Sequence, residues 1–226
     1  MKKDYLMGNG VIALGAMVAR VNLVSGYPGT PSSEIIETIA KYPHEGVHLE
    51  WSVNEKAAME VAAAAAYSGA RSMVTMKQVG LNVASDPFMS LAYVGVKGGM
   101  VVVSADDPGP ISSQTEQDTR RFAEFARVPV FDPPSPEEAF EMIQDAFLYS
   151  EKYSTPVIFR PTTRVCHAYA SVEIPDAFET KQYESFVKDS KKWVIFPKLS
   201  YVNHAMIEKR NVEIGEDFST YKYNTV

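Results

Sequence analysis

Residues 21–42 read VNLVSGYPGTPSSEIIETIAKY, and they join a β-like run, a loop rich in glycine and proline, and a helical pattern. Within the loop, Thr30 followed by Pro31 is typical of a helix start, with threonine as N-cap and proline at the first helical position. A strand, a short loop and a helix in this order are the repeating unit of an α/β protein.

The same succession recurs over the first 160 residues. The predicted strands are Val21–Ser25, Val47–Val53, Arg71–Met76, Met100–Ser104, Val128–Phe131 and Pro156–Arg160. Helical stretches begin near Pro31, Asn54, Asn82, Gln114 and Pro136, and a further helix runs from Gly10 to Arg20. The run Met100–Val103 has no polar residue, as expected of a strand buried on both faces. The sequence therefore predicts an α/β fold with three layers, α/β/α, around a mostly parallel sheet of about six strands.

Composition excludes several classes of protein. The chain has 226 residues, of which 46% are hydrophobic and 22% charged, as in an ordinary globular protein. Its one cysteine, Cys166, excludes internal disulfides and iron–sulfur clusters held by this chain alone. A net charge of −6 argues against nucleic-acid binding. We see no secretory signal and no apolar run of about 18 residues, so we expect a cytoplasmic protein without a membrane span.

Charge is distributed unevenly along the chain. Residues 181–226 contain eight Lys or Arg and six Asp or Glu, so residues 1–180 carry a net charge of −8. We predict a folded domain over residues 1–175, followed over residues 176–226 by a polar linker or the start of another domain.

In open parallel sheets, ligands bind beyond the carboxyl ends of the strands. The segments that follow the predicted strands are polar and rich in small residues; they are Gly26–Ser33, Asn54–Ala58, Lys77–Pro87 and Ala105–Gln114. We expect a ligand site where these segments meet.

The loop at residues 26–34 has two interpretations of about equal weight. Its glycines and the following helix start suit a close approach to an anionic ligand, and they equally suit a tight turn with a good cap. The pattern is neither a P-loop nor a dinucleotide-binding fingerprint.

Glu55 lies in the sequence SVNEKAA at residues 52–58. Ser52 lies three residues before Glu55, which is the spacing of a capping box, and the local sequence favours this role in capping a helix. Alternatively, Glu55 is a carboxylate at a strand end that faces the crevice. Similarly, Asn82 in the third segment is explained most simply as a helix cap, and the run Asp106–Pro110 is explained as a turn.

Taken together in this order, GYPGTPSSE, NEKAA and KQVGLNVASDP resemble the pyrimidine-binding domain of thiamine-diphosphate-dependent 2-oxoacid:ferredoxin oxidoreductases. Within that family, the similarity is greatest to the α subunits of the enzymes that act on indolepyruvate. The resemblance extends over residues 1 to about 210 and depends on three motifs in a fixed order.

The resemblance implies specific roles for five residues. Glu55 is the catalytic and cofactor-binding residue, which hydrogen-bonds N1′ of the thiamine diphosphate aminopyrimidine and holds a proton there. Gly80, Leu81 and Asn82 line the cofactor cleft, and Thr30 contacts the carboxylate of the 2-oxoacid substrate. No metal ligand is assigned to this chain.

The resemblance also implies partners that this chain does not contain. In the family, a second domain with a Gly-Asp-Gly motif holds the diphosphate and Mg²⁺, and that motif is absent from this sequence. Iron–sulfur clusters, coenzyme A and ferredoxin complete the reaction, an oxidative decarboxylation of an aryl 2-oxoacid to an acyl-CoA. We therefore expect a fragment, or a subunit of a homo- or hetero-oligomer, that supplies half of an active site.

Two alternatives stay open. One is a subunit of a non-oxidative thiamine-dependent decarboxylase of the phosphonopyruvate or sulfopyruvate type, which reduces no electron acceptor. The other is a non-catalytic α/β scaffold in which Glu55 only caps a helix.

Overall fold

The structure is a computed structural model, and it describes residues 2–43 and 45–224. Within these residues the strands are β1 (Lys2–Met7), β2 (Leu23–Gly26), β3 (His48–Trp51), β4 (Ser72–Lys77), β5 (Met100–Ala105), β6 (Val130–Phe131), β7 (Val157–Phe159) and β8 (Tyr169–Ile174). The helices in the same residues are α1 (Gly8–Val18), α2 (Ser33–Lys41), α3 (Glu55–Tyr67), α4 (Gln78–Val83), α5 (Ser85–Val94), α6 (Thr119–Ala126), α7 (Pro136–Tyr153), α8 (Thr163–His167), α9 (Ser190–Trp193) and α10 (Pro197–Ser219).

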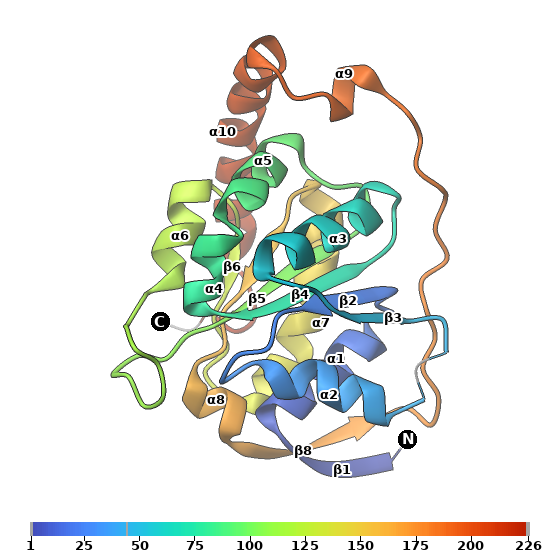
Figure 1. The fold of residues 1–226 in the computed structure, drawn as a ribbon, viewed down its shortest axis with the longest axis vertical. Coiled ribbons are helices and arrows are strands. Elements are labelled where there is room, and N and C mark those ends of the chain that lie inside the picture. Colours follow the sequence, from blue (N-terminus) through green and yellow to red (C-terminus); the bar gives the residue numbers. More distant parts are fainter. Residues whose placement is uncertain (1, 44, 225–226) are drawn as a thin grey trace.

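The main sheet has six parallel strands in the order β3-β2-β4-β5-β7-β6. Each of the six predicted strands overlaps one of these. Helices cover both faces, as Figure 1 shows. The predicted three-layer α/β/α architecture is confirmed, because each strand–helix–strand unit returns the chain to the same edge of the sheet.

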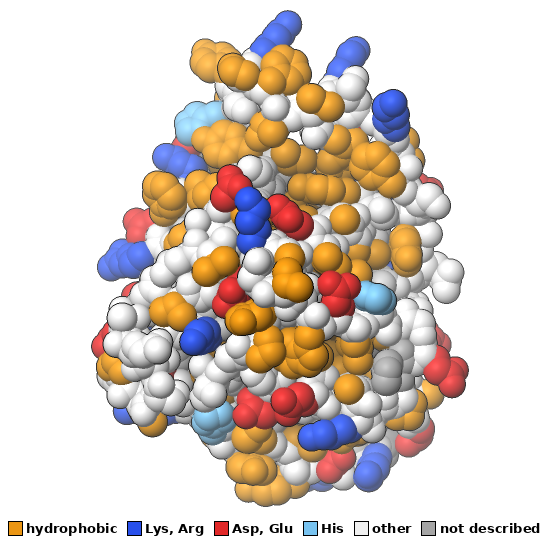
Figure 2. Space-filling view, viewed as in Figure 1, with side chains coloured by type: hydrophobic (Ala, Val, Ile, Leu, Met, Phe, Trp, Pro, Cys, Tyr) orange, Lys and Arg blue, Asp and Glu red, His pale blue; other side chains and the backbone are white. Residues whose placement is uncertain are grey.

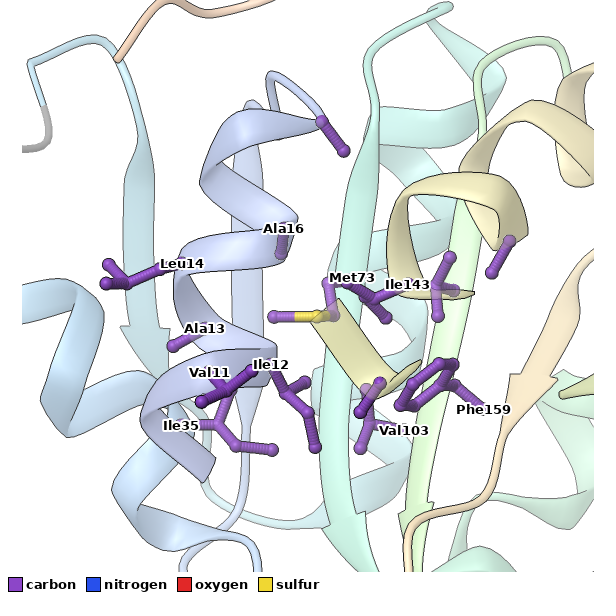
Figure 3. Close-up of a cluster of buried hydrophobic side chains, with 14 of the residues drawn as sticks. Val11, Ile12, Ala13, Leu14, Ala16, Ile35, Met73, Val103, Ile143 and Phe159 are labelled. Carbon is purple, nitrogen blue, oxygen red and sulfur yellow. The ribbon is translucent and has the colours of Figure 1, made fainter. Parts of the chain in front are cut away.

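Two hydrophobic cores lie on the two faces of the sheet. One core packs α1, α2 and α7 against strand residues such as Met73 and Val103, and Figure 3 shows Ile12 of α1 beside both. The other packs α3, α4, α5 and α6 against Val74 and Val102. Successive strand residues point to opposite faces, so β4 and β5 contribute side chains to both cores.

A second, two-stranded sheet was not predicted from the sequence. Strand β1 pairs antiparallel with β8, from Lys2 opposite Ile174 to Met7 opposite Tyr169. The rings of Tyr5 and Tyr169 stack with centroids 5.4 Å apart. The partners are far apart in the sequence, at residues 2–7 and 169–174, so neither segment carries a local signal of the pairing.

Several predicted helix starts shift in the structure. Helix α7 begins as predicted at Pro136, and Ser135 caps it by accepting a hydrogen bond of 3.2 Å from the Glu138 amide. Helix α2, however, begins at Ser33, and Thr30 is not its N-cap. The helix expected near Gln114 begins at Thr119, where Asp118 is the cap. The loops before α2 and α6 are longer than the local cap patterns indicate, because residues from elsewhere in the chain form hydrogen bonds with them.

The C-terminal helix α10 runs beside α5 (Figure 1). The Asn203 side chain donates a 2.9 Å hydrogen bond to the Tyr93 carbonyl. At the C-terminal end of the helix, the ring of Phe218 contacts Phe131 with centroids 5.3 Å apart, and just beyond the helix the ring of Tyr221 does so at 5.4 Å. A domain boundary near residue 175 stays a prediction. Within residues 2–43 and 45–224, no helix combines the length and the apolar composition that a membrane span requires.

Candidate functional site

The predicted motifs follow strands that lie side by side in the sheet. Gly26 at the end of β2 pairs with Trp51 at the end of β3 and with Thr75 near the end of β4. The chain leaves β2 for α2 on one face and leaves β4 for α4 on the opposite face. Loops that diverge to opposite faces open a crevice between neighbouring strands, which is where α/β proteins bind ligands.

Glu55 is the first residue of α3, and it is not part of a capping box. The N-cap is Asn54, whose side chain accepts a 2.9 Å hydrogen bond from the Ala57 amide. Ser52 donates its hydroxyl to Glu50 at 2.8 Å and does not contact the helix start. The local prediction for Ser52 and Glu55 is therefore wrong, and the Glu55 carboxylate is left available for another role.

The Glu55 side chain is buried, with an exposed fraction of 7%. A Cβ placed on Gly80 would lie only 2.6 Å from its Oε1 and 3.0 Å from its Cδ. Within the described residues, no donor forms a hydrogen bond with this carboxylate. The carboxylate oxygens are not fully enclosed by the described residues, so they are open to a ligand that supplies a donor.

The three residues of the Gly80–Asn82 segment lie in helix α4, directly after β4. Gly80 and Leu81 are buried, and the absence of a side chain at Gly80 is what allows α4 to approach Glu55. Asn82 is exposed and exchanges two 3.0 Å hydrogen bonds with the Gln117 amide. Because Asn82 lies inside α4, the expectation that it caps a helix is wrong. Its role in binding a cofactor stays a prediction.

The loop at residues 26–34 reaches the same place from β2. A Cβ on Gly29 would lie 3.1 Å from Cδ of Lys77, so this loop lies against the end of β4. From helix α1, Asn9 donates to the Pro31 carbonyl at 2.6 Å and to the Glu34 carboxylate at 2.9 Å. Thr30 is exposed in this loop. All three motifs therefore meet around the segment from Lys77 to Asn82.

Sequence reasoning did not identify Gln78. Its side chain is fully buried, and its Nε2 donates 3.1 Å to the Thr115 carbonyl. Its Oε1 is buried without a hydrogen-bond partner in the described part of the chain. Gln78 thus links the end of β4 to the loop before α6. The available signal was a polar residue immediately after a buried strand.

Asp107 organises the loop that follows β5. Its Oδ2 accepts three backbone hydrogen bonds of 2.9–3.0 Å, from Ile111, Ser112 and Ser113. Its Oδ1 accepts from the Thr163 hydroxyl at 2.8 Å. Burial alone would raise the pKa of Asp107, but these donors outweigh it and hold the pKa well below its usual range. The loop is therefore fixed by an ionised carboxylate.

Asp106 is the centre of a buried ionic cluster. It accepts 2.8 Å hydrogen bonds from Nε of Arg160 and the hydroxyl of Thr119, and a 2.9 Å bond from the Thr119 amide. Arg160 also contacts Asp132, at 3.1 Å. Burial raises the pKa of Asp106, whereas the guanidinium and Thr119 lower it. The expectation of a simple turn over Asp106–Pro110 missed these contacts, because Arg160 is distant in sequence.

A cavity of about 400 Å³ adjoins these motifs. Leu81 and Asn82 line one side, and Phe122 and Phe125 of α6 line the other. A volume and an apolar wall of this kind suit a small organic molecule. In the described ranges, 2–43 and 45–224, no group of three or more His, Cys, Asp or Glu side chains is placed to hold a metal ion.

Comparison with known proteins finds similar sequences over almost the whole chain. The profile of the family described as "Pyruvate flavodoxin/ferredoxin oxidoreductase, thiamine diP-bdg" matches residues 14–218. The indolepyruvate oxidoreductase subunit IorA of Thermococcus kodakarensis is 45% identical over all of this chain and 36% of that relative. The corresponding subunit of Methanothermobacter marburgensis is 47% identical over 98% of this chain and 36% of its own length.

More distant relatives act on another substrate class by name. The 2-oxoglutarate synthase subunit KorA of Archaeoglobus fulgidus is 27% identical over 84% of this chain and 57% of that relative. The solved 2-oxoglutarate:ferredoxin oxidoreductase of Magnetococcus marinus has a TM-score of 0.74 at 17% identity, over 97% of this chain and 46% of that one. This likeness supports the fold.

The chain spans about a third of the length of the IorA relatives that it matches. Within that part, the family profile, the relatives and the meeting of the three motifs agree. The chain belongs to the thiamine-diphosphate-binding family of pyruvate flavodoxin/ferredoxin oxidoreductases.

Proposed function

We propose that this chain is the pyrimidine-binding part of a thiamine-diphosphate-dependent oxidoreductase that converts indolepyruvate and related aryl 2-oxoacids to acyl-CoA with ferredoxin as acceptor. The observation that carries the proposal is the Glu55 carboxylate, buried against Gly80 and without a donor in the described residues. The aminopyrimidine N1′ of thiamine diphosphate fits this carboxylate, because it is a ring nitrogen that needs a protonatable acid as partner.

Glu55 holds or releases a proton at N1′ of the bound cofactor. When bound, thiamine diphosphate supplies the electron sink for decarboxylation. A carboxylic acid suits this task and an amide does not, because only the acid exchanges a full proton. The absence of a side chain at Gly80 keeps the carboxylate close to α4.

Other residues of the crevice bind and orient the substrate and the cofactor. Thr30 contacts the substrate carboxylate, and Asn82 lines the cofactor cleft beside Leu81. The reciprocal amide pair of Asn82 and Gln117 ties α4 to the loop before α6. Asp107 holds the first part of that loop, so the wall of the crevice is fixed before a ligand arrives.

The remaining groups belong to other domains or chains. The diphosphate and Mg²⁺ require a phosphate-binding domain or subunit, since this sequence has no Gly-Asp-Gly motif. The iron–sulfur clusters require cysteines, and this chain has only Cys166, which is buried. The cofactor therefore lies between this domain and another, in a homo- or hetero-oligomer. We expect the assembly in the cytoplasm.

The indolepyruvate substrate is supported by the IorA relatives at 42–47% identity, against 26–27% for the KorA relatives. The test uses the native assembly captured through this chain. Anaerobic reduction of a viologen dye should require indolepyruvate, coenzyme A and thiamine diphosphate together, and 2-oxoglutarate should substitute poorly. Decarboxylation without dye reduction would instead identify a non-oxidative decarboxylase.

A further inference from the structure

A second cavity lies away from the crevice, where α9 and α10 meet the ends of α5 and α7. Its volume is about 530 Å³, and none of the residues assigned to the thiamine site line it. Figure 2 shows that Lys and Arg side chains stand among apolar side chains at this end of the molecule. The volume lies within the range of small-molecule sites.

Arg210 of α10 lines this cavity without an acidic partner. Its Nε is buried and has no hydrogen-bond partner within residues 2–43 and 45–224. Its guanidinium makes one long contact, 3.5 Å, with the Arg127 carbonyl. By contrast, the buried guanidinium groups of Arg71 and Arg160 each form a 2.8 Å ion pair with a carboxylate. Burial lowers the pKa of Arg210 to about 10, so it is still charged at neutral pH.

Two lysines add to this positive charge. Lys191 and Lys192 of α9 line the cavity and form no ion pair with a described residue. Lys152 also lines it, but Lys152 is neutralised by Asp217. The one carboxylate in the lining, Glu213, lies 3.9 Å from Lys209. A chain of net charge −6 thus gathers an excess of unpaired cations around one cavity.

The rest of the lining is largely apolar. Tyr93 of α5 and Leu199 and Met206 of α10 form part of the wall. Arg210 is half-buried and has no acidic partner, and the two lysines form no ion pair, although Lys192 Nζ lies 4.4 Å from the centroid of the Trp193 ring. These cations and an apolar wall suit a ligand with a multiply charged end and an apolar or aromatic body. Three unpaired cations are better matched by a phosphate dianion than by a single carboxylate.

We propose that this cavity binds a small molecule that carries a phosphate group on an apolar or aromatic body, with the phosphate held by Arg210, Lys191 and Lys192. The site is separate from the thiamine crevice, and the proposal does not depend on the proposed function. Ligand binding at this position would also join α10 to the ends of α5 and α7.

Phenyl phosphate and inorganic phosphate test the site, because they share the anion and differ in the aromatic body. Binding is measured by isothermal titration calorimetry on the purified assembly that contains this chain, saturated with thiamine diphosphate. We expect phenyl phosphate to bind more tightly than inorganic phosphate. Arg210→Met should weaken phenyl phosphate binding at least about tenfold, the loss expected for one charge-assisted anchor.

Lys198→Met is the matched control, since Lys198 is an exposed lysine of the same helix and does not line the cavity. It should change the affinity less than about twofold. If Arg210→Met does not assemble, the double variant of Lys191→Met and Lys192→Met, both on the exposed helix α9, should give the same loss. The proposal is overturned if wild-type protein binds neither probe, or if the cavity variants bind phenyl phosphate as well as Lys198→Met does.

Discussion

Two groups of buried acidic side chains lie along the same edge of the sheet, and their surroundings are opposite. After β5, Asp106 and Asp107 accept hydrogen bonds from a guanidinium, two hydroxyls and several backbone amides. At the start of α3, Glu55 is buried with no donor from any described residue. Protein donors therefore satisfy the carboxylates of the first group, whereas the Glu55 carboxylate has none and is open to a ligand.

We expect this contrast to separate structural carboxylates from a functional one. Loss of a partner from the Asp106 group should cost stability, and loss of the Glu55 charge should cost activity. The predictions below test this division in order of decreasing effect.

Arg160→Met should have the largest effect, on stability. It leaves Asp106 buried without its guanidinium, and breaking a buried ion pair from one side costs about 3–5 kcal/mol of unfolding free energy. Urea denaturation of the purified protein measures the change. Arg164→Met, at an exposed arginine four positions later, should stay within about 0.5 kcal/mol of wild type. Equal stabilities for the two variants would remove the distinction between the two groups.

Glu55→Gln should lower turnover of the assembled enzyme at least about 100-fold, equivalent to about 2.7 kcal/mol of activation free energy. Its unfolding free energy should not fall, because the amide replaces a buried charge that lacks a donor. Viologen reduction and urea denaturation measure the two quantities. Glu60→Gln, at an exposed position of the same helix, is the control. Near-wild-type turnover in Glu55→Gln would contradict the assigned role.

Gly80→Ala should reduce turnover by about tenfold, because the new Cβ would meet the Glu55 carboxylate at 2.6 Å and displace it. Helix propensity alone would favour alanine within α4. Gly215→Ala in α10 is the control, since no heavy atom lies within 4 Å of the added Cβ. A Gly80→Ala enzyme as active as the control would show that Glu55 does not depend on this contact.

Glu151 extends the comparison to another, partly buried carboxylate. Arg71 donates two 2.8 Å hydrogen bonds to it, and Lys181 donates one more. Burial alone would raise the pKa of Glu151, but these partners lower it from 4.5 to about 2. A lowered folded-state pKa means that its stabilising contribution is complete above the unfolded value and is lost as the pH falls from about 5 to about 2.

The melting temperature of wild-type protein should therefore exceed that of Glu151→Gln near neutral pH, and the gap should close over this acidic range. Glu137→Gln, at an exposed glutamate at the start of α7, should show no such gap. A gap that is constant with pH would mean that Glu151 contributes through packing alone.

The sequence predicted the sheet well because its information is local. All six parallel strands were identified from short β-like runs, and Ser135 and Pro136 placed the start of α7 correctly. The motifs containing Glu55 and Gly80 do meet at the expected edge. Each of these features is encoded by residues that are neighbours in the chain or by the rule that parallel strands share an edge.

The features that were missed depend on distant partners. Ser52 fits the pattern of a capping box, but Asn54 is the N-cap, and a sequence pattern cannot decide between two candidates two positions apart. The local sequence around Asp106 is typical of a turn, and it does not show the ion pair with Arg160, which directly follows β7. The pairing of β1 with β8 and the packing of α10 likewise involve segments whose partners are remote in sequence.

Strand β4 has a consequence for how the molecule opens. Met73 belongs to the core of α1 and α7, and Val74, the next residue, belongs to the core of α3 and α5. Neither layer of helices can therefore separate without stripping one side of the same strand. We expect the amide protons of β4 to exchange with deuterium only through global unfolding. The two helical layers should then unfold as one cooperative unit, and the position of Glu55 should be lost only when the whole fold is lost.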